Sequence, residues 1–113
     1  MELQTLDDNG LLSQIGVLRD QDSFLEFHHR YQKAAYSLAL FITRDLNLAE
    51  EAVQEAMLKV WLKAATYRPQ ETPRSWVLRV VSRECFKKLR SKRRSERKPW
   101  LREIALNSEG HPL

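Results

Sequence analysis

The sequence has few of the residues that crosslink a chain or break its regular structure. Among 113 residues there are one cysteine, three glycines and four prolines. A single cysteine forms no internal disulfide, so the composition excludes the disulfide-stapled secreted class and predicts a reduced, cytoplasmic protein. Long apolar runs are lacking as well, because the longest one covers residues 34–42 and contains Ser37. A membrane-spanning helix needs about 20 apolar residues, so no membrane insertion is expected.

The residues that are present favour helices. Strong helix formers such as Ala, Leu, Glu, Gln, Lys and Arg are common, and β-branched residues are few. With 42% hydrophobic and 30% charged residues, the chain is not collagen-like, low-complexity or wholly disordered. Its length suits one domain with a core of its own. We predict an all-α fold, a compact bundle of three main helices plus a short N-terminal helix. The domain is expected over residues 11–94, between a flexible N-terminus (residues 1–10) and a basic tail (residues 95–113).

Apolar residues recur at spacings of three and four in separate segments of the chain. This spacing predicts a short helix over residues 11–19 and longer helices over about residues 24–44, 48–65 and 73–93. The predicted loops between the longer helices are short, which favours antiparallel packing of neighbouring helices.

Polar residues mark the expected starts of the three longer helices. A small polar residue followed three positions later by Glu is typical of a capping box, and Thr before Pro is typical of an N-cap followed by the first helical residue. The starts predicted in this way are Ser23 with Glu26, Asn47 with Glu50, and Thr72 with Pro73.

Charge is unevenly distributed along the chain. Residues 1–57 carry four basic and ten acidic side chains, whereas residues 58–113 carry fifteen basic and five acidic ones. A basic half of this kind is typical of binding to a polyanion such as nucleic acid, but also of a solvated helix face followed by a disordered tail. At about 100° per residue, one side of the last predicted helix forms a basic stripe flanked by Trp76 and Phe86. The stripe consists of Arg79, Arg83, Lys87, Arg90 and Arg94.

No pattern typical of catalysis or of cofactor binding is found in the sequence. The three glycines are scattered, so they form no phosphate-binding loop. His28 and His29 point about 100° apart on a helix and have no further ligand at metal-binding spacing. Cys85 falls on the apolar side of the last predicted helix, where a core residue is expected rather than a nucleophile. We predict a protein that is not an enzyme and that has no metal or cofactor.

Three segments carry a more specific pattern. Residues 49–61 read AEEAVQEAMLKVW, residues 73–81 read PRSWVLRVV, and residues 24–31 space their Phe and Tyr at helical intervals. Together they resemble region 2 of bacterial RNA polymerase sigma factors, especially of the extracytoplasmic-function (ECF) group. Glu51 stands where the family usually has Asp, and Met57 where it usually has Phe. The resemblance covers about residues 11–94 and implies the sigma factor region 2 fold.

The resemblance implies that the chain binds core RNA polymerase. In the family, the helix equivalent to residues 49–61 docks on the clamp helices of the β′ subunit. Polar residues at spacings of three and four form one patch on such a helix, and carboxylate and amide groups suit charged hydrogen bonds with arginine on a partner. An ordinary solvated helix face is the alternative. The implied polymerase-binding residues are Glu51, Gln54, Glu55 and Leu58.

The resemblance also implies recognition and melting of the promoter −10 element. In the family, the loop before the basic helix holds a flipped base, and the basic helix contacts the DNA. Melted strands need cations along the backbone and a pocket for an unstacked base. Arg83 and Lys87 replace the Asn and Asp that many family members carry, which leaves the −10 sequence open. The implied DNA-binding residues are Tyr67, Arg68, Arg74, Trp76, Arg79, Arg83, Lys87, Arg90 and Arg94.

Further partners and other functions stay open at this point. An anti-sigma factor that covers the same surfaces is a partner that the resemblance implies. The family's second domain, which reads the −35 element, has no counterpart in these residues, and residues 95–113 are expected to begin the linker towards it. The chain is either a fragment of a two-domain sigma factor or a single-domain relative. Other candidate functions are a generic basic helical nucleic-acid binder without polymerase binding, and a protein whose basic helix lies on an anionic membrane surface.

Overall fold

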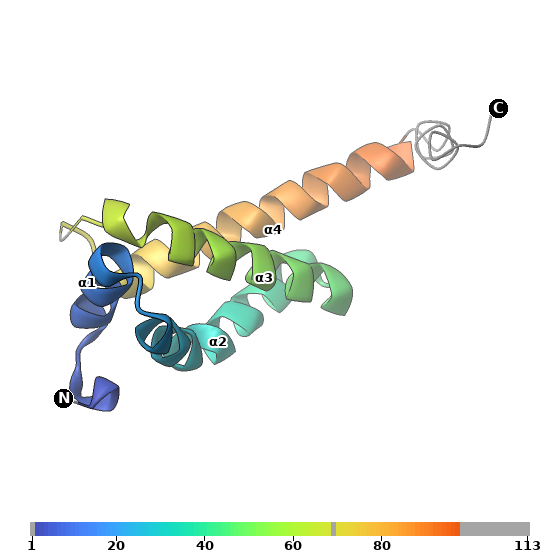
Figure 1. Ribbon diagram of the computed structural model, residues 1–113. Helices are drawn as coiled ribbons and strands as arrows, with labels where there is room; N and C mark the ends of the chain where they lie inside the picture. Colours follow the sequence, from blue (N-terminus) through green and yellow to red (C-terminus); the bar gives the residue numbers. More distant parts are fainter. Residues whose placement is uncertain (1, 69, 98–113) are drawn as a thin grey trace, which may run out of the picture.

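The computed structural model describes residues 2–68 and 70–97. Three long helices pack against one another, and a short helix lies across one end of them (Figure 1). Within the described residues all regular structure is helical, which confirms the predicted all-α bundle of three main helices plus a short N-terminal helix. The elements are the 3-10 helix η1 (Leu3–Thr5), α1 (Asp8–Leu18), α2 (Gln21–Thr43), α3 (Leu46–Lys63), the 3-10 helix η2 (Ala64–Thr66) and α4 (Pro73–Arg97).

Helices α2 and α3 begin earlier than predicted, because an upstream aspartate caps each of them. Asp20 accepts a hydrogen bond from the backbone N–H of Ser23 at 3.2 Å, and Asp45 accepts one from Leu48 at 3.0 Å. The hydrogen bond from Leu48 lowers the pKa of Asp45 and keeps its carboxylate charged. A charged carboxylate also interacts favourably with the positive end of the helix dipole. The capping boxes predicted at Ser23 and Asn47 are therefore wrong.

Two arginines make the connections between these helices short. Arg19 (φ 54°) and Arg44 (φ 56°) adopt the left-handed conformation that ends a helix. Each arginine is followed directly by the aspartate that caps the next helix, so only two residues connect α1 to α2 and α2 to α3. The chain therefore turns sharply at both points.

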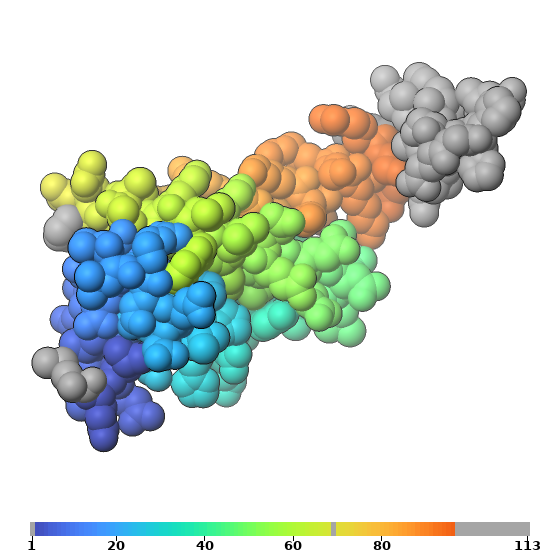
Figure 2. Space-filling model, viewed as in Figure 1, coloured from blue at the N-terminus to red at the C-terminus, as the bar shows by residue number. Residues whose placement is uncertain are grey.

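Helix α4 begins at the predicted residue and ends later than predicted. The Thr72 hydroxyl accepts a hydrogen bond from the backbone N–H of Ser75 at 3.1 Å, and Pro73 is the first helical residue, which confirms this N-cap. The helix continues to Arg97, so the boundary predicted at residue 94 falls inside it. The rest of the predicted tail, residues 98–113, lies outside the described residues. The C-terminal turns of α4 project beyond α3 (Figure 1, Figure 2).

Small apolar side chains fill the space between the long helices. Helices α2 and α3 contribute several alanines, which let the two backbones approach closely, and α4 contributes mainly valine and cysteine. Cys85 is a core residue, as predicted, and burial raises the pKa of its thiol, so it is no reactive nucleophile. Buried members of this core include Ala35, Ala39, Ala49, Ala52, Ala56, Val77, Val81 and Cys85.

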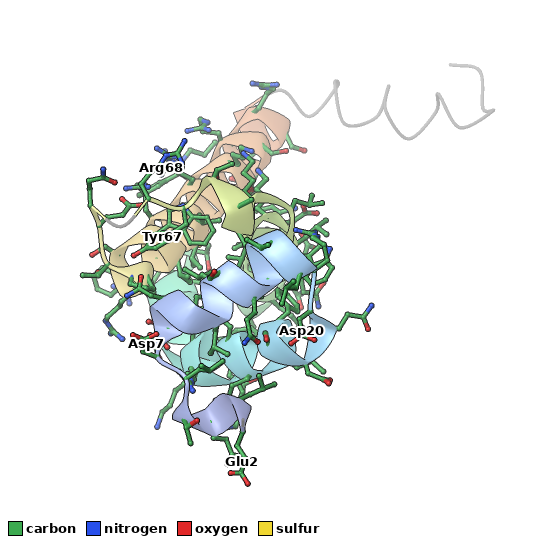
Figure 3. All side chains as sticks on the ribbon, turned by 60° about the vertical axis from the view of Figure 1, so that its left-hand side comes forward. Glu2, Asp7, Asp20, Tyr67 and Arg68 are labelled. Atoms are coloured by element: carbon green, nitrogen blue, oxygen red, sulfur yellow. The ribbon has the colours of Figure 1, made fainter. Side chains whose placement is uncertain are left out.

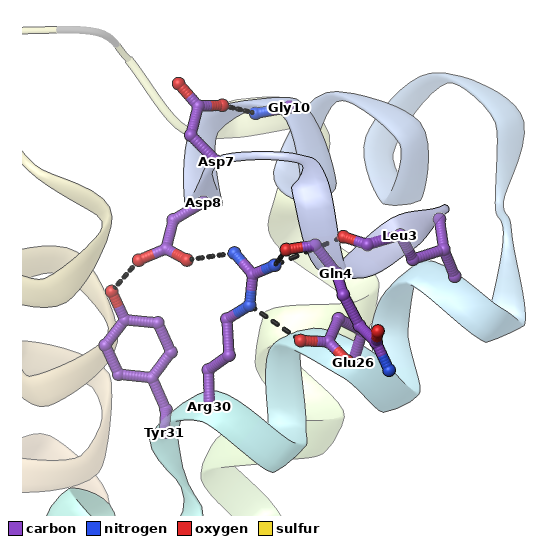
Figure 4. Close-up of polar contacts among 8 residues, drawn as sticks. All are labelled: Leu3, Gln4, Asp7, Asp8, Gly10, Glu26, Arg30 and Tyr31. Carbon is purple, nitrogen blue, oxygen red and sulfur yellow. Dashed lines mark hydrogen bonds and ion pairs between the residues drawn. The ribbon is translucent and has the colours of Figure 1, made fainter. Parts of the chain in front are cut away.

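The N-terminal residues are tied to α2 by a network of charged groups (Figure 4). Arg30 donates hydrogen bonds to Asp8 at 2.9 Å, to Glu26 at 2.7 Å and to the backbone oxygens of residues 3–4. The buried Tyr31 donates its hydroxyl hydrogen to the same Asp8 carboxylate, and burial and this bond raise the pKa of Tyr31. The N-terminus expected to be flexible thus contains η1 and the first residues of α1.

Helix α1 is seated against η2 through Gly16. A β-carbon at this position would lie 2.8 Å from the Cα atom of Ala65, so only glycine fits here without displacing the backbone. Tyr67 adds a second link, because its hydroxyl group is hydrogen-bonded to the Asn9 side-chain oxygen at 2.9 Å. Helix α1 therefore positions the start of the loop that joins α3 to α4.

Candidate functional site

The four residues predicted to bind a partner protein lie together on the outward side of α3. Glu51, Gln54, Glu55 and Leu58 are all exposed, and their spacing of three and four places them along one side of the helix. We call them the α3 strip. Among the described residues, only Glu51 of this set has a cation within ion-pair distance, the Lys88 Nζ atom at 3.7 Å. The α3 strip is therefore an acidic and amide surface that ends in an exposed leucine.

An apolar groove of about 560 Å³ lies beside the α3 strip, between α2 and α3. The rings of Phe24 and Trp61 pack edge to face in it, with centroids 5.4 Å apart. Sequence analysis does not find the groove, because two helices must pack before it exists. Two of its lining residues, Leu25 and Leu58, are exposed apolar side chains. The residues shared with the α3 strip are Gln54 and Leu58, and the apolar lining includes Phe24, Leu25, Tyr36, Met57 and Trp61.

The cations of the predicted stripe on α4 fall into two groups. Arg79 donates hydrogen bonds to Glu71 at 2.6 and 2.8 Å, and the Lys87 Nζ atom lies 3.4 Å from a Glu84 oxygen. A cation whose charge is already balanced by a carboxylate is a weaker ligand for phosphate. The exposed stripe residues without an ion-pair partner in the described part of the chain, here called the open arginines, are Arg83, Arg90 and Arg94.

A buried carboxylate joins α4 to α3. Glu84 is 4% exposed and accepts hydrogen bonds from Lys59 of α3 and from Lys87. Burial alone raises the pKa of Glu84, but the hydrogen bonds and charges of Lys59 and Lys87 outweigh that effect and hold the pKa below its ordinary value. We call the line of contact between α3 and α4 the seam. The other ion pairs along it are Lys88 with Glu51 at 3.7 Å and Lys92 with Asp45 at 3.6 Å.

The loop before α4 forms a hollow against the first turns of that helix. Figure 3 shows Tyr67 and Arg68 at this end of the molecule, where α1, the loop and α4 meet. The Tyr67 hydroxyl is hydrogen-bonded to the backbone oxygen of Glu71, and burial, with the Glu71 charge, raises the pKa of Tyr67. These contacts fix the loop around the hollow. Its lining consists of Thr66, Arg68, Gln70, Glu71, Trp76 and Arg79.

Two of the predicted DNA-binding residues lie differently from the others. Trp76 is only 7% exposed, and its ring packs edge to face against Tyr67 with centroids 5.7 Å apart. It forms a wall of the hollow and not an exposed stacking surface. Arg74 is exposed but lies about 140° around α4 from Arg79, and its charge acts on Tyr31 of α2. The structure thus separates Arg74 from the basic stripe.

The described residues hold neither a candidate metal site nor a candidate membrane span. No group of three or more His, Cys, Asp or Glu side chains among them could hold a metal ion. His28 lines the groove with its ring centroid 6.4 Å from that of Phe24, and His29 is exposed. Across residues 2–68 and 70–97, no helix is both long and apolar enough to cross a membrane.

Comparison with known proteins agrees with this arrangement. Residues 27–95, which include both candidate surfaces, match the Sigma-70 region 2 family. The chain is 32% identical over 92 residues to the ECF RNA polymerase sigma factor SigK of Mycolicibacterium vanbaalenii, a match that covers 80% of the chain and 46% of SigK. It is 30% identical over 74 residues to the ECF RNA polymerase sigma factor SigM of Mycobacterium tuberculosis, with 66% of the chain and 38% of SigM covered. The chain thus spans less than half the length of these relatives.

Sigma factors are transcription initiation factors without catalytic activity of their own, which confirms the prediction that the chain is not an enzyme. The match extends from within α2 almost to the end of α4 and so includes the helix that carries the α3 strip and the helix that carries the open arginines. The chain belongs to the Sigma-70 region 2 family and is a region 2 domain of the ECF sigma factor type.

Proposed function

We propose that this domain directs transcription initiation by binding core RNA polymerase through α3 and promoter −10 DNA through α4 and the loop before it. The observation that carries the proposal is that one bundle presents two outward surfaces of opposite chemistry, the α3 strip and the open arginines. A domain of this kind holds a protein and a DNA strand at the same time and leaves the chemistry to the polymerase. The proposed place of action is the cytoplasm, where core polymerase works.

The α3 strip suits a partner helix that carries arginine, as proposed for the β′ clamp helices. Gln54 and Glu55 have no side-chain partner among the described residues, so their oxygens can accept hydrogen bonds from another chain. Hydrogen bonds between arginine and carboxylate are short and strong, and opposite charges also speed association. Leu58 and the apolar groove beside it supply the buried contact that a stable protein interface needs at its centre.

The open arginines suit the backbone of a DNA strand. Arg83, Arg90 and Arg94 span about 16 Å along α4 on one side of the helix, enough to contact several phosphates in succession. Phosphate contacts position a strand but do not read its sequence. The hollow beside Trp76 can add this reading, because an open hollow with an aromatic wall and the polar groups of Glu71 and Arg79 suits one unstacked base. We therefore assign sequence preference to the hollow and affinity to the arginines.

Charge reversal on the α3 strip tests the proposal. Glu55→Arg places a cation where the partner is proposed to carry one, so co-elution of the whole chain with bacterial core RNA polymerase should be lost. Glu2→Arg is the matched control, because it makes the same charge change at an exposed residue outside α3 and outside the apolar groove. This control should co-elute like the unchanged chain.

The contrary outcomes point to other functions. A chain that binds DNA with strong salt dependence but has no affinity for core polymerase is a generic basic nucleic-acid binder, and the sigma factor proposal then fails. Equal effects of Glu55→Arg and Glu2→Arg would move the polymerase contact away from the α3 strip. An anti-sigma factor that covers either surface would block the proposed activity, because both surfaces are needed at once.

A further inference from the structure

Phe86 is an exposed aromatic ring set among the open arginines. It is the one large apolar side chain exposed on the described part of α4, with 50% of its surface accessible. Arg83 precedes it by three residues and Arg90 follows it by four, so the three side chains share one side of the helix. At a rise of about 1.5 Å per residue, the two arginines lie about 10 Å apart along the axis with the ring between them.

The packing of the bundle does not account for an aromatic residue at this position. The buried Val77 and Val81 lie on the opposite side of α4, and Phe86 is not among the residues that pack against the core. Its ring has no aromatic neighbour in the described residues. An exposed ring among unpaired cations is the combination that binds single-stranded nucleic acid, because a base stacks on the ring while the cations hold its phosphates.

We propose that Phe86 is the stacking platform for one unpaired base of the promoter strand, with Arg83 and Arg90 holding the phosphates on either side. The inference rests on the proposed function, because it places a strand along the open arginines. Phe86 lies about 15 Å along α4 from Trp76, so the platform is separate from the hollow. Stacking on an aromatic face accepts any base. The platform therefore favours a melted strand over a duplex without adding sequence preference.

The test measures how tightly the whole chain, assembled with core RNA polymerase, holds a single-stranded oligonucleotide and the matching duplex. Phe86→Ala should weaken single-strand binding by about 5- to 150-fold and change duplex binding much less. The dependence of affinity on salt should stay the same, because no cation is removed. Arg83→Ala should instead lower the slope of log affinity against log salt by about 0.7. In oligonucleotides with a single abasic site, the effect of Phe86→Ala should vanish when the missing base is the one that stacks.

Phe41→Ala is the matched control. Phe41 is 68% exposed and has an arginine, Arg44, 5.2 Å from its ring centroid, but it lies on α2. This variant should leave strand binding unchanged. The inference is overturned if Phe86→Ala behaves like Phe41→Ala, or if Phe86→Ala weakens polymerase binding, which would make the ring a protein contact. A failure of the proposed function looks different, because the unchanged chain with core polymerase then retains no strand at all.

Discussion

Helices α3 and α4 are alike on their inner sides and opposite on their outer sides. Both bury small apolar side chains against α2 and against each other. The core therefore fixes where the outward residues stand but not which charge they carry. Each surface is thus free to suit a different partner. The outward sets are Glu51, Glu55 and Leu58 on α3, and Arg83, Arg90 and Phe86 on α4.

At the seam between the two helices, each helix carries the charge opposite to that of its outer side. Helix α3, which is acidic outside, contributes Lys59, and α4, which is basic outside, contributes Glu84. The lysines of α4 nearest to α3, Lys88 and Lys92, are also paired with carboxylates. The cations that stay open are those that face away from α3. Among the cations beside α3, distance from the seam thus decides which are available to DNA, whereas Arg79 is paired with Glu71 of the loop before α4.

The largest effect is expected on the free energy of unfolding, when the buried carboxylate at the seam is removed. Glu84→Ala removes a buried carboxylate together with its hydrogen bonds from Lys59 and Lys87, so the free energy of unfolding should fall by about 2 kcal/mol. Urea unfolding followed by circular dichroism measures this as a lower midpoint at an unchanged slope. Glu51→Ala, which removes the exposed partner of Lys88, is the control and should cost less than about 1 kcal/mol. Equal losses of unfolding free energy in the two variants would show that a buried ion pair of Glu84 stabilises the fold no more than an exposed one does.

A smaller effect is expected on single-strand affinity when one cation of α4 is removed. This effect should differ between open and paired cations. Arg90→Ala removes an open arginine, so single-strand affinity in the complex with core polymerase should fall by roughly tenfold, and the salt slope by about 0.7. Lys92→Ala removes a lysine that already lies 3.6 Å from Asp45 and 3.9 Å from Glu96. Its effect on both quantities should be clearly smaller. Two variants with the same salt slope would contradict the division into open and paired cations.

The smallest effect is expected on the stability of the fold when the pH is lowered. The pKa of Glu84 is lower in the folded than in the unfolded chain, so Glu84 stabilises the fold above the unfolded value of about 4.3. This contribution is lost as the pH falls through the lower, folded pKa. Urea midpoints measured from pH 7 down to pH 3 should therefore decline less for Glu84→Gln than for the unchanged chain. A parallel decline would show that other carboxyl groups cause the acid sensitivity.

The helices and their outward residues could be predicted from the sequence because a bundle requires apolar residues on the inner side of each helix. The outward position of Glu51, Gln54 and Glu55 follows from that requirement, whereas their role and the inclusion of the exposed Leu58 come from the family resemblance. The caps could not be predicted in the same way, since Asp20 and Ser23 are both good cap residues, and Asp45 and Asn47 likewise. The left-handed turn just before each aspartate decides between them, and no local spacing reveals it.

Contacts between distant segments account for the site features that the sequence did not show. Lys87 and Glu84 are three residues apart, so their pairing has a local signal. Arg79 pairs with Glu71 because the loop folds back on α4, and Trp76 is buried because Tyr67 packs against it. Neither contact follows from periodicity. Sequence analysis therefore finds the basic stripe but not which of its cations are open.

Through the contacts of Gly16 and Tyr67, the shape of the hollow depends on α1, which lies far from the loop in the sequence. The hydrogen bond between Tyr67 and Asn9 joins residues 58 positions apart. Contacts over such separations form after local helices, because a long loop must first be closed. The seam between α3 and α4 needs no residue of α1, whereas the shape of the hollow does. The base selectivity proposed for the hollow thus depends on α1, a helix that contributes no residue to the lining of the hollow.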